Sequence, residues 1–176
     1  RMQNILASYY AKRMGLPVHK FICASNSNNV LTDFIRTGTY DKKRAFYTTI
    51  SPSMDILVSS NLERLLYHLC GEDTEKLTGW MNALQSGGAY TVDAATADAV
   101  RALFYGGCCD DKETVEVIRN TFEKDGYLCD THTAVAVGVY EQYLKETGDN
   151  TPAVIASTAS PYKFPDLSLI HISEPT

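Results

Sequence analysis

The alternation of helix-type and strand-type patterns near the start of the chain constrains its fold more than any other feature. Apolar residues keep helical spacing over residues 4–14, and residues 18–25 form an apolar, aromatic-containing segment of strand length. A second helical run follows over residues 28–38, and Asn28 or Asn29 is expected to cap it. The order helix, strand, helix predicts an α/β layer with a parallel sheet.

Helix-type patterns dominate the middle of the chain. Ser60 and Glu63 fit a capping box, in which the serine oxygen and the glutamate satisfy free amides at a helix start. Asp93 and Asp111 are expected to cap two later helices. Helices are expected at residues 60–69, 73–88, 93–105 and 111–126, and one short strand is expected at residues 89–92. Residues 71–127 are therefore predicted to form a small, mainly helical subdomain.

The last part of the chain combines a helix with a strand that ends in small polar residues. Residues 131–147 have the pattern of a helix whose small side chains let its backbone approach a neighbour closely, with Gly148 as C-cap. Residues 153–157 have the pattern of a buried strand. Because ligands in open α/β sheets bind at the carboxyl ends of strands, the turn at 157–160 is the first expected site.

Charge and hydropathy argue against two classes of partner. The net charge is -5 and the sequence has no long Lys/Arg cluster, so a nucleic acid is not expected to bind. No apolar run reaches the length of a membrane span, and no basic region followed by an apolar run marks a signal peptide. The expected location is cytoplasmic, and no membrane partner is expected.

The cysteines favour free thiols in a reducing compartment. They are odd in number and form no CxxC pair: Cys23, Cys70, Cys108, Cys109 and Cys129. His68 and Cys70, together with the Cys108–Cys109 pair, are ligand types that zinc prefers, but their spacing matches no closed ligand pattern. No metal site is therefore expected.

Several stretches resemble the threonine synthase family. The matching segments are residues 4–17, FICASNSNN at 21–29, SPSMDILVSSNLERLL at 51–66 and ASTASPYKF at 156–164. With their spacing they cover about residues 4–165, which is more specific than any single short motif. The resemblance ends near Pro165, and residues 167–176 have no helical or strand period. We interpret that tail as non-native.

The resemblance implies a fold class and a cofactor. The expected fold is α/β, part of a type II pyridoxal-phosphate fold, with a three-layer sheet and helices plus a mainly helical insert. Residues 1–70 are implied to be part of the large cofactor domain, and residues 71–127 the helical insert. Residues 128–166 return to the large domain, and residues 167–176 are the tail. The implied cofactor is pyridoxal 5'-phosphate.

The resemblance also implies that two parts of the family's site lie elsewhere. The family holds the cofactor phosphate on a Gly-Asn-Phe-Gly loop before the first helix, where backbone amides bind anions. Arg1, Met2 and Gln3 stand in that place here, and Asn4 alone remains as a cofactor-binding candidate. The Schiff-base lysine lies farther upstream in the family, so no catalytic residue is assigned and this chain alone is expected to be inactive.

Thr158 is the strongest candidate for contact with the cofactor. By resemblance, its hydroxyl donates to the pyridine nitrogen, and Ser157 and Ser160 on either side bind the cofactor or shape the turn. Without the resemblance, an ordinary hydroxyl at a strand end, bonded to its own turn, would be the favoured interpretation.

The substrate-binding candidates lie in two other segments. Ser59, Ser60, Asn61 and Arg64 are candidates for the substrate phosphate, because hydroxyls and amides at a helix start bind anions and arginine grips them bidentately. The alternative is plain capping by Ser60 beside a solvated arginine. The further candidates, which are equally typical of turn and cap residues, are Asn26 and Asn28.

Two further residues could be mistaken for catalytic groups, and we assign them no catalytic role. Lys163 is the lysine nearest the expected site, but it stands in the wrong segment for a Schiff base and is interpreted as a surface or structural charge. His132, in the first turn of the last expected helix, has the position of a general base, yet such a histidine is more often a polar surface group.

The resemblance implies conversion of the small-molecule substrate O-phosphohomoserine, with water, to L-threonine and phosphate. In that family the cofactor acts as an electron sink while protein groups orient the substrate and transfer protons. Two alternatives stay open. One is another type II pyridoxal-phosphate enzyme, such as a threonine dehydratase or a cysteine synthase. The other is a non-catalytic α/β binding module, although the sequence has no complete glycine fingerprint for it.

Overall fold

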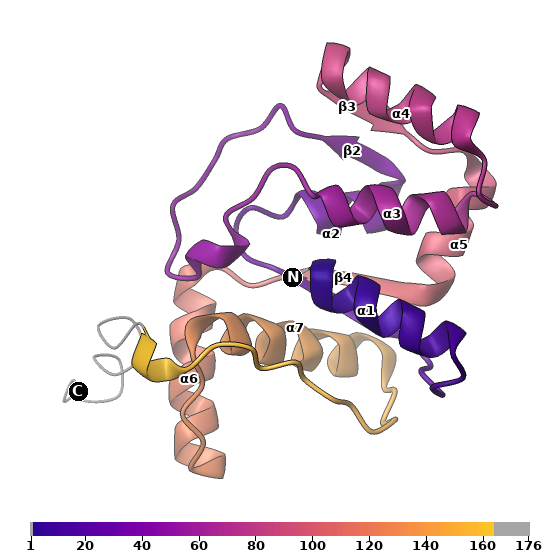
Figure 1. Cartoon of the computed structure of the whole chain (residues 1–176). Helices are drawn as coiled ribbons and strands as arrows, with labels where there is room; N and C mark the ends of the chain where they lie inside the picture. The colour runs from indigo at the N-terminus through magenta and orange to yellow at the C-terminus, as the bar shows by residue number, and fades with distance from the viewer. Residues whose placement is uncertain (1, 164–176) are drawn as a thin grey trace. The chain divides into compact units, whose positions relative to one another are not determined.

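Helices make up most of the described residues, and four short strands pair into two small sheets. The computed structural model describes residues 2–163 (Figure 1). Among these residues the chain forms two compact units, and we describe each by itself. The first unit comprises residues 2–23, 29–46 and 56–106, and the second comprises residues 24–28, 47–55 and 107–163. The predicted tail at 167–176 lies outside the described residues.

Within the described residues, the first unit consists of five helices and a small two-stranded sheet. Its helices are α1 (Met2–Arg13), α2 (Val30–Thr37), α3 (Ser60–Leu69), α4 (Thr74–Gly87) and α5 (Ala94–Leu103). Strands β2 (Thr39–Asp41) and β3 (Ala89–Thr91) pair antiparallel, with Tyr40 opposite Tyr90. Helix α3 packs against α1, α4 and α5, and α2 packs against β2 and α5. The leucines of α3 form its inner face, since Leu62, Leu65 and Leu66 are buried.

Aromatic side chains fill the core of the first unit beside this sheet. The rings of Tyr40 and Tyr90 stack with centroids 5.5 Å apart, and Phe34 lies 6.0 Å from each of them. Trp80 of α4 extends the stack on Tyr90, with ring centroids 6.4 Å apart. Such offset aromatic contacts add to the free energy gained from apolar burial. These aromatic contacts hold the β2–β3 sheet against helices α2 and α4 of this unit.

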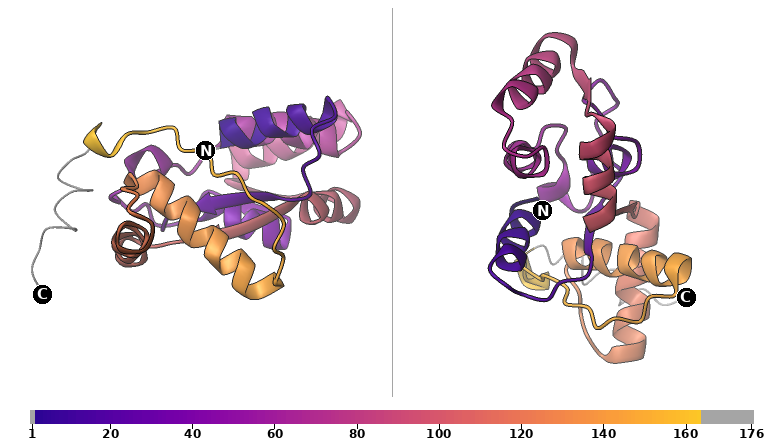
Figure 2. Two further views of the ribbon diagram at one scale, coloured as in Figure 1. Left: turned by 90° about the horizontal axis from the view of Figure 1, so that it is seen from below. Right: turned by 90° about the vertical axis from the view of Figure 1, so that its right-hand side faces the viewer.

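The second unit is built around two helices, α6 (Asp111–Asp125) and α7 (Thr131–Thr147), which pack on one another (Figure 2). The close approach predicted for the small residues of α7 is confirmed at Gly138. A Cβ atom at that position would lie 3.1 Å from both Cys109 Sγ and Val117 Cγ2. Two 3₁₀ turns, η1 (Pro52–Met54) and η2 (Pro161–Lys163), complete the unit.

Strands β1 (Phe21–Ser25) and β4 (Phe104–Cys108) pair in a second two-stranded sheet. The strand predicted over residues 18–25 is thus confirmed in its second half. The helix predicted over residues 93–105 was too long, because α5 ends at Leu103 and the chain continues as β4. The sequence FYGGC of β4 contains two glycines, which weaken a strand pattern, and the strand forms because β1 supplies hydrogen bonds.

The strand predicted at residues 153–157 is wrong for the described chain. Residues 151–160 belong to no helix or strand, and Val154 is 98% exposed. A β-type sequence becomes a strand only when a neighbouring strand satisfies its backbone groups, and no described strand lies beside this one. The segment instead returns in an extended conformation from the end of α7 toward its start, as Figure 1 shows.

Helix caps explain where most helices begin and end. Asp73 and Asp93 cap α4 and α5 through backbone N–H groups, and for Asp93 this is the cap expected from the sequence. The prediction for α6 was wrong by one residue, because Asp110 is its cap and forms a capping box with Glu113. Glycines in the left-handed conformation end α2, α4, α6 and α7 at Gly38, Gly88, Gly126 and Gly148.

Two predicted caps are absent. Helix α3 begins at Ser60, so that Ser59 is its N-cap, and the side chain of Ser59 makes no cap hydrogen bond. The predicted Ser60–Glu63 capping box is therefore wrong. Asn29 is the N-cap of α2 and also makes no side-chain cap bond, while Asn28 turns its amide toward another loop. Among the described residues, no helix is long and apolar enough to cross a membrane.

Candidate functional site

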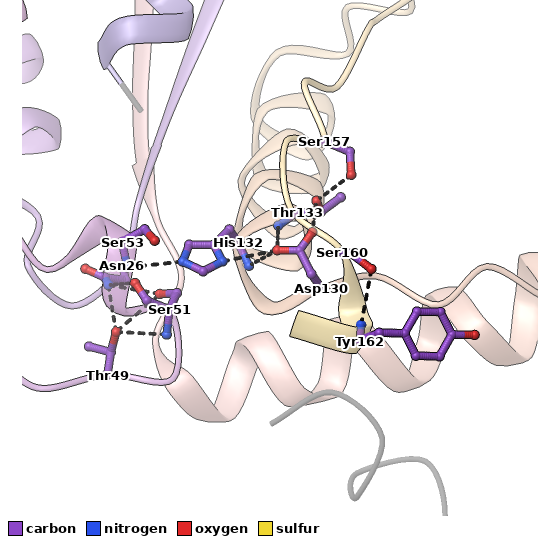
Figure 3. A network of polar contacts seen from close by, with 10 residues as sticks. All are labelled: Asn26, Thr49, Ser51, Ser53, Asp130, His132, Thr133, Ser157, Ser160 and Tyr162. Atoms are coloured by element: carbon purple, nitrogen blue, oxygen red, sulfur yellow. Dashed lines mark hydrogen bonds and ion pairs between the residues drawn. The ribbon is translucent and has the colours of Figure 1, made fainter. Parts of the chain in front are cut away.

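A buried carboxylate organises the start of α7. Asp130 is 2% exposed and caps the helix, accepting hydrogen bonds at Oδ1 from the backbone N–H of His132 at 2.9 Å and of Thr133 at 3.3 Å. Its Oδ1 also lies 3.1 Å from His132 Nδ1, and its Oδ2 accepts a hydrogen bond from the hydroxyl of Thr133. Both oxygens are therefore engaged, as Figure 3 shows. Burial by itself raises the pKa of Asp130, but the hydrogen bonds from His132 and Thr133 outweigh it and lower the pKa.

His132 is not the surface group that the sequence suggested. Its side chain is 12% exposed, and its Nε2 accepts a hydrogen bond from the backbone N–H of Ser53 at 3.2 Å. Because a backbone N–H can only donate, Nε2 must carry a lone pair, and the ring hydrogen is assigned to Nδ1, which faces Asp130. This neutral form joins α7 to the loop of residues 47–55. A ring with both nitrogens engaged in this way is unsuited to act as a general base.

The opposite side of Asp130 connects to the predicted cofactor turn. Thr133, 5% exposed, donates its hydroxyl to Asp130 and lies 2.9 Å from Ser157 Oγ. The next residue, Thr158, has an exposed side chain and makes no hydrogen bond to another described residue. Ser160 shapes the end of the turn, since its Oγ accepts from Tyr162 N at 3.3 Å. The turn is thus held at Ser157 and leaves the hydroxyl of Thr158 available.

Lys163 has the surface position that the sequence predicted. It ends η2 with an exposed side chain, and its backbone N–H donates to the carbonyl of Ser160 at 3.0 Å. This backbone contact closes the 3₁₀ turn η2, which follows the turn at 157–160.

The loop of residues 47–55 is held by two buried asparagines. The amide nitrogen of Asn26 lies 2.8 Å from Thr49 Oγ1, 2.9 Å from Ser51 Oγ and 2.8 Å from Asp55 Oδ1. The side chain of Asn28 pairs with both backbone groups of Tyr47, at 2.8 Å and 2.9 Å. With exposures of 1% and 3%, both asparagines hold the loop in place through hydrogen bonds inside the protein. Their predicted contact with substrate stays a prediction.

The predicted phosphate-binding residues lie in the first unit, at the start of α3. The backbone N–H of Ser59 donates to Tyr40 Oη at 3.1 Å, and the guanidinium of Arg64 donates to Asn61 Oδ1 at 2.6 Å. Ser60 and Arg64 are exposed, and Ser59 and Asn61 are partly exposed. A helix start without a side-chain cap leaves backbone amides available to an anion.

Asn4, the remaining cofactor candidate, also belongs to the first unit. It lies in the first turn of α1 with a partly exposed side chain, and its carbonyl accepts a hydrogen bond from Ser8 Oγ at 2.8 Å.

The cysteines are free, and three of them are buried. Burial raises the pKa of Cys23, Cys109 and Cys129 to about 11, so these thiols stay protonated and unreactive at neutral pH. Within residues 2–163, no group of three or more His, Cys, Asp or Glu side chains is arranged to hold a metal ion.

Sequence reasoning missed the residues that connect the loops. Asp130 and Thr133 were not singled out, and neither was Asp55, which accepts hydrogen bonds from Asn26, Asn28 and Thr49. The signal for Asp130 was present, because an aspartate directly before a helix pattern is a typical N-cap. Nothing in the sequence indicates that the same carboxylate also reaches the side chains of its first turn.

Comparison with known proteins confirms the family resemblance seen in the sequence. The family described as "Threonine synthase, C-terminal" matches residues 133–168, which include the turn at 157–160. Threonine synthase-like 1 of Homo sapiens is 44% identical over 162 residues, covering 92% of this chain and 21% of that protein. The threonine synthase of Schizosaccharomyces pombe is 38% identical over 182 residues, covering 92% of this chain and 35% of that enzyme.

Solved structures agree with the sequence matches. The pyridoxal-phosphate-bound threonine synthase of Brucella melitensis has a TM-score of 0.89 and 39% identity, covering 98% of this chain and 36% of that one. Threonine synthase from yeast has a TM-score of 0.91 and 34% identity with the same coverage of 98% and 36%. The predicted α/β fold class is therefore confirmed. The chain is similar in sequence and structure to the threonine synthases and spans about a third of the length of these enzymes.

Proposed function

We propose that this chain forms part of a threonine synthase, which converts O-phosphohomoserine and water to L-threonine and phosphate with pyridoxal 5'-phosphate. The identity of 36% to 38% with curated threonine synthases over at least 92% of the chain supports the proposal. The structural observation that carries it is the turn at 157–160, which is anchored at Ser157 and leaves the hydroxyl of Thr158 available.

The chemistry of the donor set fits the pyridine end of the cofactor. Pyridoxal phosphate, when bound, supplies an electron sink for carbanion chemistry. The part of Thr158 is to donate its hydroxyl to the ring nitrogen, and Ser157 and Ser160 keep the turn in shape beside it. A hydroxyl is a neutral donor, so it orients the ring without adding a charge. Asn4 is proposed to lie near the cofactor phosphate.

The start of α3 is proposed to bind the phosphate of the substrate. Ser59, Ser60 and Asn61 offer hydroxyl and amide groups at a helix start, where the helix dipole favours an anion. Arg64 adds a positive charge on the same turn, held toward Asn61 by their hydrogen bond. Together these groups would hold the phosphate of the substrate in position until it is released.

The catalytic lysine is proposed to lie outside these 176 residues. A group that is both the attachment point of the cofactor and a proton carrier contributes orders of magnitude in rate. The chain by itself is therefore expected to release no phosphate from O-phosphohomoserine.

A hybrid enzyme tests the proposed function. In the hybrid, the matching segment of yeast threonine synthase is replaced by residues 4–165 of this chain. We expect the hybrid to form threonine and phosphate in equal amounts, and Thr158→Ala to lower its kcat/KM by about tenfold or more. Thr158→Ser, which keeps the hydroxyl, is the matched control. A folded hybrid that binds pyridoxal phosphate but releases no phosphate would contradict the proposal, as would turnover by the 176-residue chain alone.

A second candidate is a threonine synthase-like protein with another substrate. It is favoured by the identity to threonine synthase-like 1, which at 44% exceeds the 38% to the threonine synthase of Schizosaccharomyces pombe. The same hybrid separates the two, because a specific threonine synthase releases phosphate from O-phosphohomoserine far faster than ammonia from threonine or serine.

A further inference from the structure

One carboxylate connects two loops of the second unit. On one side, Asp130 Oδ1 lies 3.1 Å from the ring of His132, whose other nitrogen holds the backbone of Ser53 at 3.2 Å. On the other side, Asp130 Oδ2 accepts the hydroxyl of Thr133, which lies 2.9 Å from Ser157. Figure 3 shows that His132 and Thr133 approach different oxygens of the carboxylate, and that His132 points toward Ser53 and Thr133 toward Ser157.

The turn beyond Ser157 has little other support from regular structure. Residues 151–160 belong to no helix or strand, and most of them are exposed. The hydrogen bond between Thr133 and Ser157 therefore ties this segment to a buried, rigid helix start one residue before Thr158. A side chain next to such an anchor is held more precisely than one on a free loop.

We propose that Asp130 is a positioning residue, which acts through Thr133 to hold the Thr158 hydroxyl in place and through His132 to hold the loop around Ser53. The consequence for the cofactor rests on the proposed function of Thr158. The network itself does not, because all of its contacts lie within the second unit of this chain.

The chain offers substitutions that separate positioning from helix capping. Asparagine caps helices as well as aspartate does, so Asp130→Asn keeps the cap but replaces one acceptor oxygen by a donor. Thr133→Val removes the hydroxyl at nearly constant shape, and Thr133→Ser restores it. Asp110→Asn is the matched control, because Asp110 caps α6 in the same unit and its carboxylate accepts from the backbone of Glu113.

Nuclear magnetic resonance on the 176-residue chain tests the network without cofactor. In the unmodified chain we expect His132 as the Nδ1-protonated neutral tautomer, and backbone order parameters near about 0.85 at residues 157–160. Thr133→Val and Asp130→Asn are expected to lower these order parameters below about 0.6, while Thr133→Ser and Asp110→Asn leave them unchanged. An Nε2-protonated His132, or a turn equally rigid in Thr133→Val, would overturn the inference.

The hybrid enzyme tests the consequence for the cofactor. We expect Thr133→Val to shift the absorption maximum of bound pyridoxal phosphate in the same direction as Thr158→Ala, and to lower kcat by about tenfold with KM within about twofold. Thr133→Ser should restore both. If Thr158→Ala changes the spectrum and Thr133→Val does not, the positioning role fails and the proposed function stands. If Thr158→Ala leaves the spectrum unchanged, the proposed cofactor contact itself fails, while the resonance measurements still decide the network.

Discussion

Two groups of polar residues in this protein have opposite surroundings. In the second unit, Asn26, Asn28 and Asp130 are 1% to 3% exposed and engaged on all sides by the protein itself. At the start of α3 in the first unit, Ser60 and Arg64 are exposed and the helix has no side-chain cap. The first, saturated group holds structure through hydrogen bonds inside the protein, whereas the second, unsaturated group retains hydrogen-bonding capacity for a ligand.

The largest expected loss of stability comes from removing a buried side chain of the saturated group. Asn26→Ala leaves Asp55, Thr49 and Ser51 without the amide that joins them, so we expect a loss of about 2–3 kcal/mol in the free energy of unfolding. Urea denaturation measures it. Asn61→Ala, whose side chain contacts Arg64 at the surface, is the control and should cost less than about 0.5 kcal/mol. Equal costs for the two asparagines would remove the distinction between the groups.

The N-caps of α6 and α3 provide a second comparison, with a smaller expected change in stability. Asp110→Ala removes the half of the α6 capping box in which the Asp110 carboxylate accepts from the backbone N–H of Glu113, so we expect it to cost about 1 kcal/mol. Ser59→Ala at α3 removes no side-chain cap bond and should cost less than about 0.5 kcal/mol. Thermal unfolding of the two variants measures the difference. A larger cost at Ser59 would mean that its hydroxyl caps α3 in solution.

The pH dependence of stability reports on Asp130. Its pKa is lowered below the ordinary 3.8, because hydrogen bonds from His132 and Thr133 outweigh burial. A carboxyl with a lowered pKa in the folded protein stabilises fully above its unfolded pKa, and this stability is lost as the pH falls through the folded pKa. The gap in unfolding free energy between the unmodified chain and Asp130→Asn should therefore stay constant down to about pH 5 and shrink below about pH 4. A gap that widens in acid would contradict the assignment.

The smallest expected effect on stability is at Thr158. Its side chain is exposed and makes no hydrogen bond to another described residue, so Thr158→Ala should change the free energy of unfolding of the chain by less than about 0.5 kcal/mol. Thr133→Val, which removes a buried hydroxyl, should cost about 1–2 kcal/mol by the same denaturation measurement. A Thr158 cost as large as that of Thr133 would make Thr158 a structural residue.

The sequence predicted the parts of the fold that local chemistry determines. The carboxylate of Asp93 before α5 indicated where that helix begins, and Gly148 after α7 indicated where that helix ends. Strands depend on partners from distant parts of the chain, which is why the first two residues of β4 were taken for the end of a helix and residues 153–157 for a strand. The neighbouring acids Asp110 and Asp111 could not be ranked as caps from sequence, since either side chain suits the position.

The candidate site was predictable only in part for the same reason. The turn at 157–160 was found through family resemblance, and the structure adds how Thr133 anchors it. His132 was taken for a surface group because a first-turn histidine carries no local sign of burial. Its partner Ser53 is 79 residues away in sequence, a contact that only the folded chain brings about.

The most direct test of the central claim is a crystal structure of the hybrid enzyme with pyridoxal phosphate bound. The quantity to measure is the distance between Thr158 Oγ1 and the pyridine nitrogen. We expect about 2.7–3.0 Å, within the range of a hydrogen bond from a hydroxyl, with Ser157 still bonded to Thr133. A distance beyond about 4 Å, or another side chain at the ring nitrogen, would contradict the account.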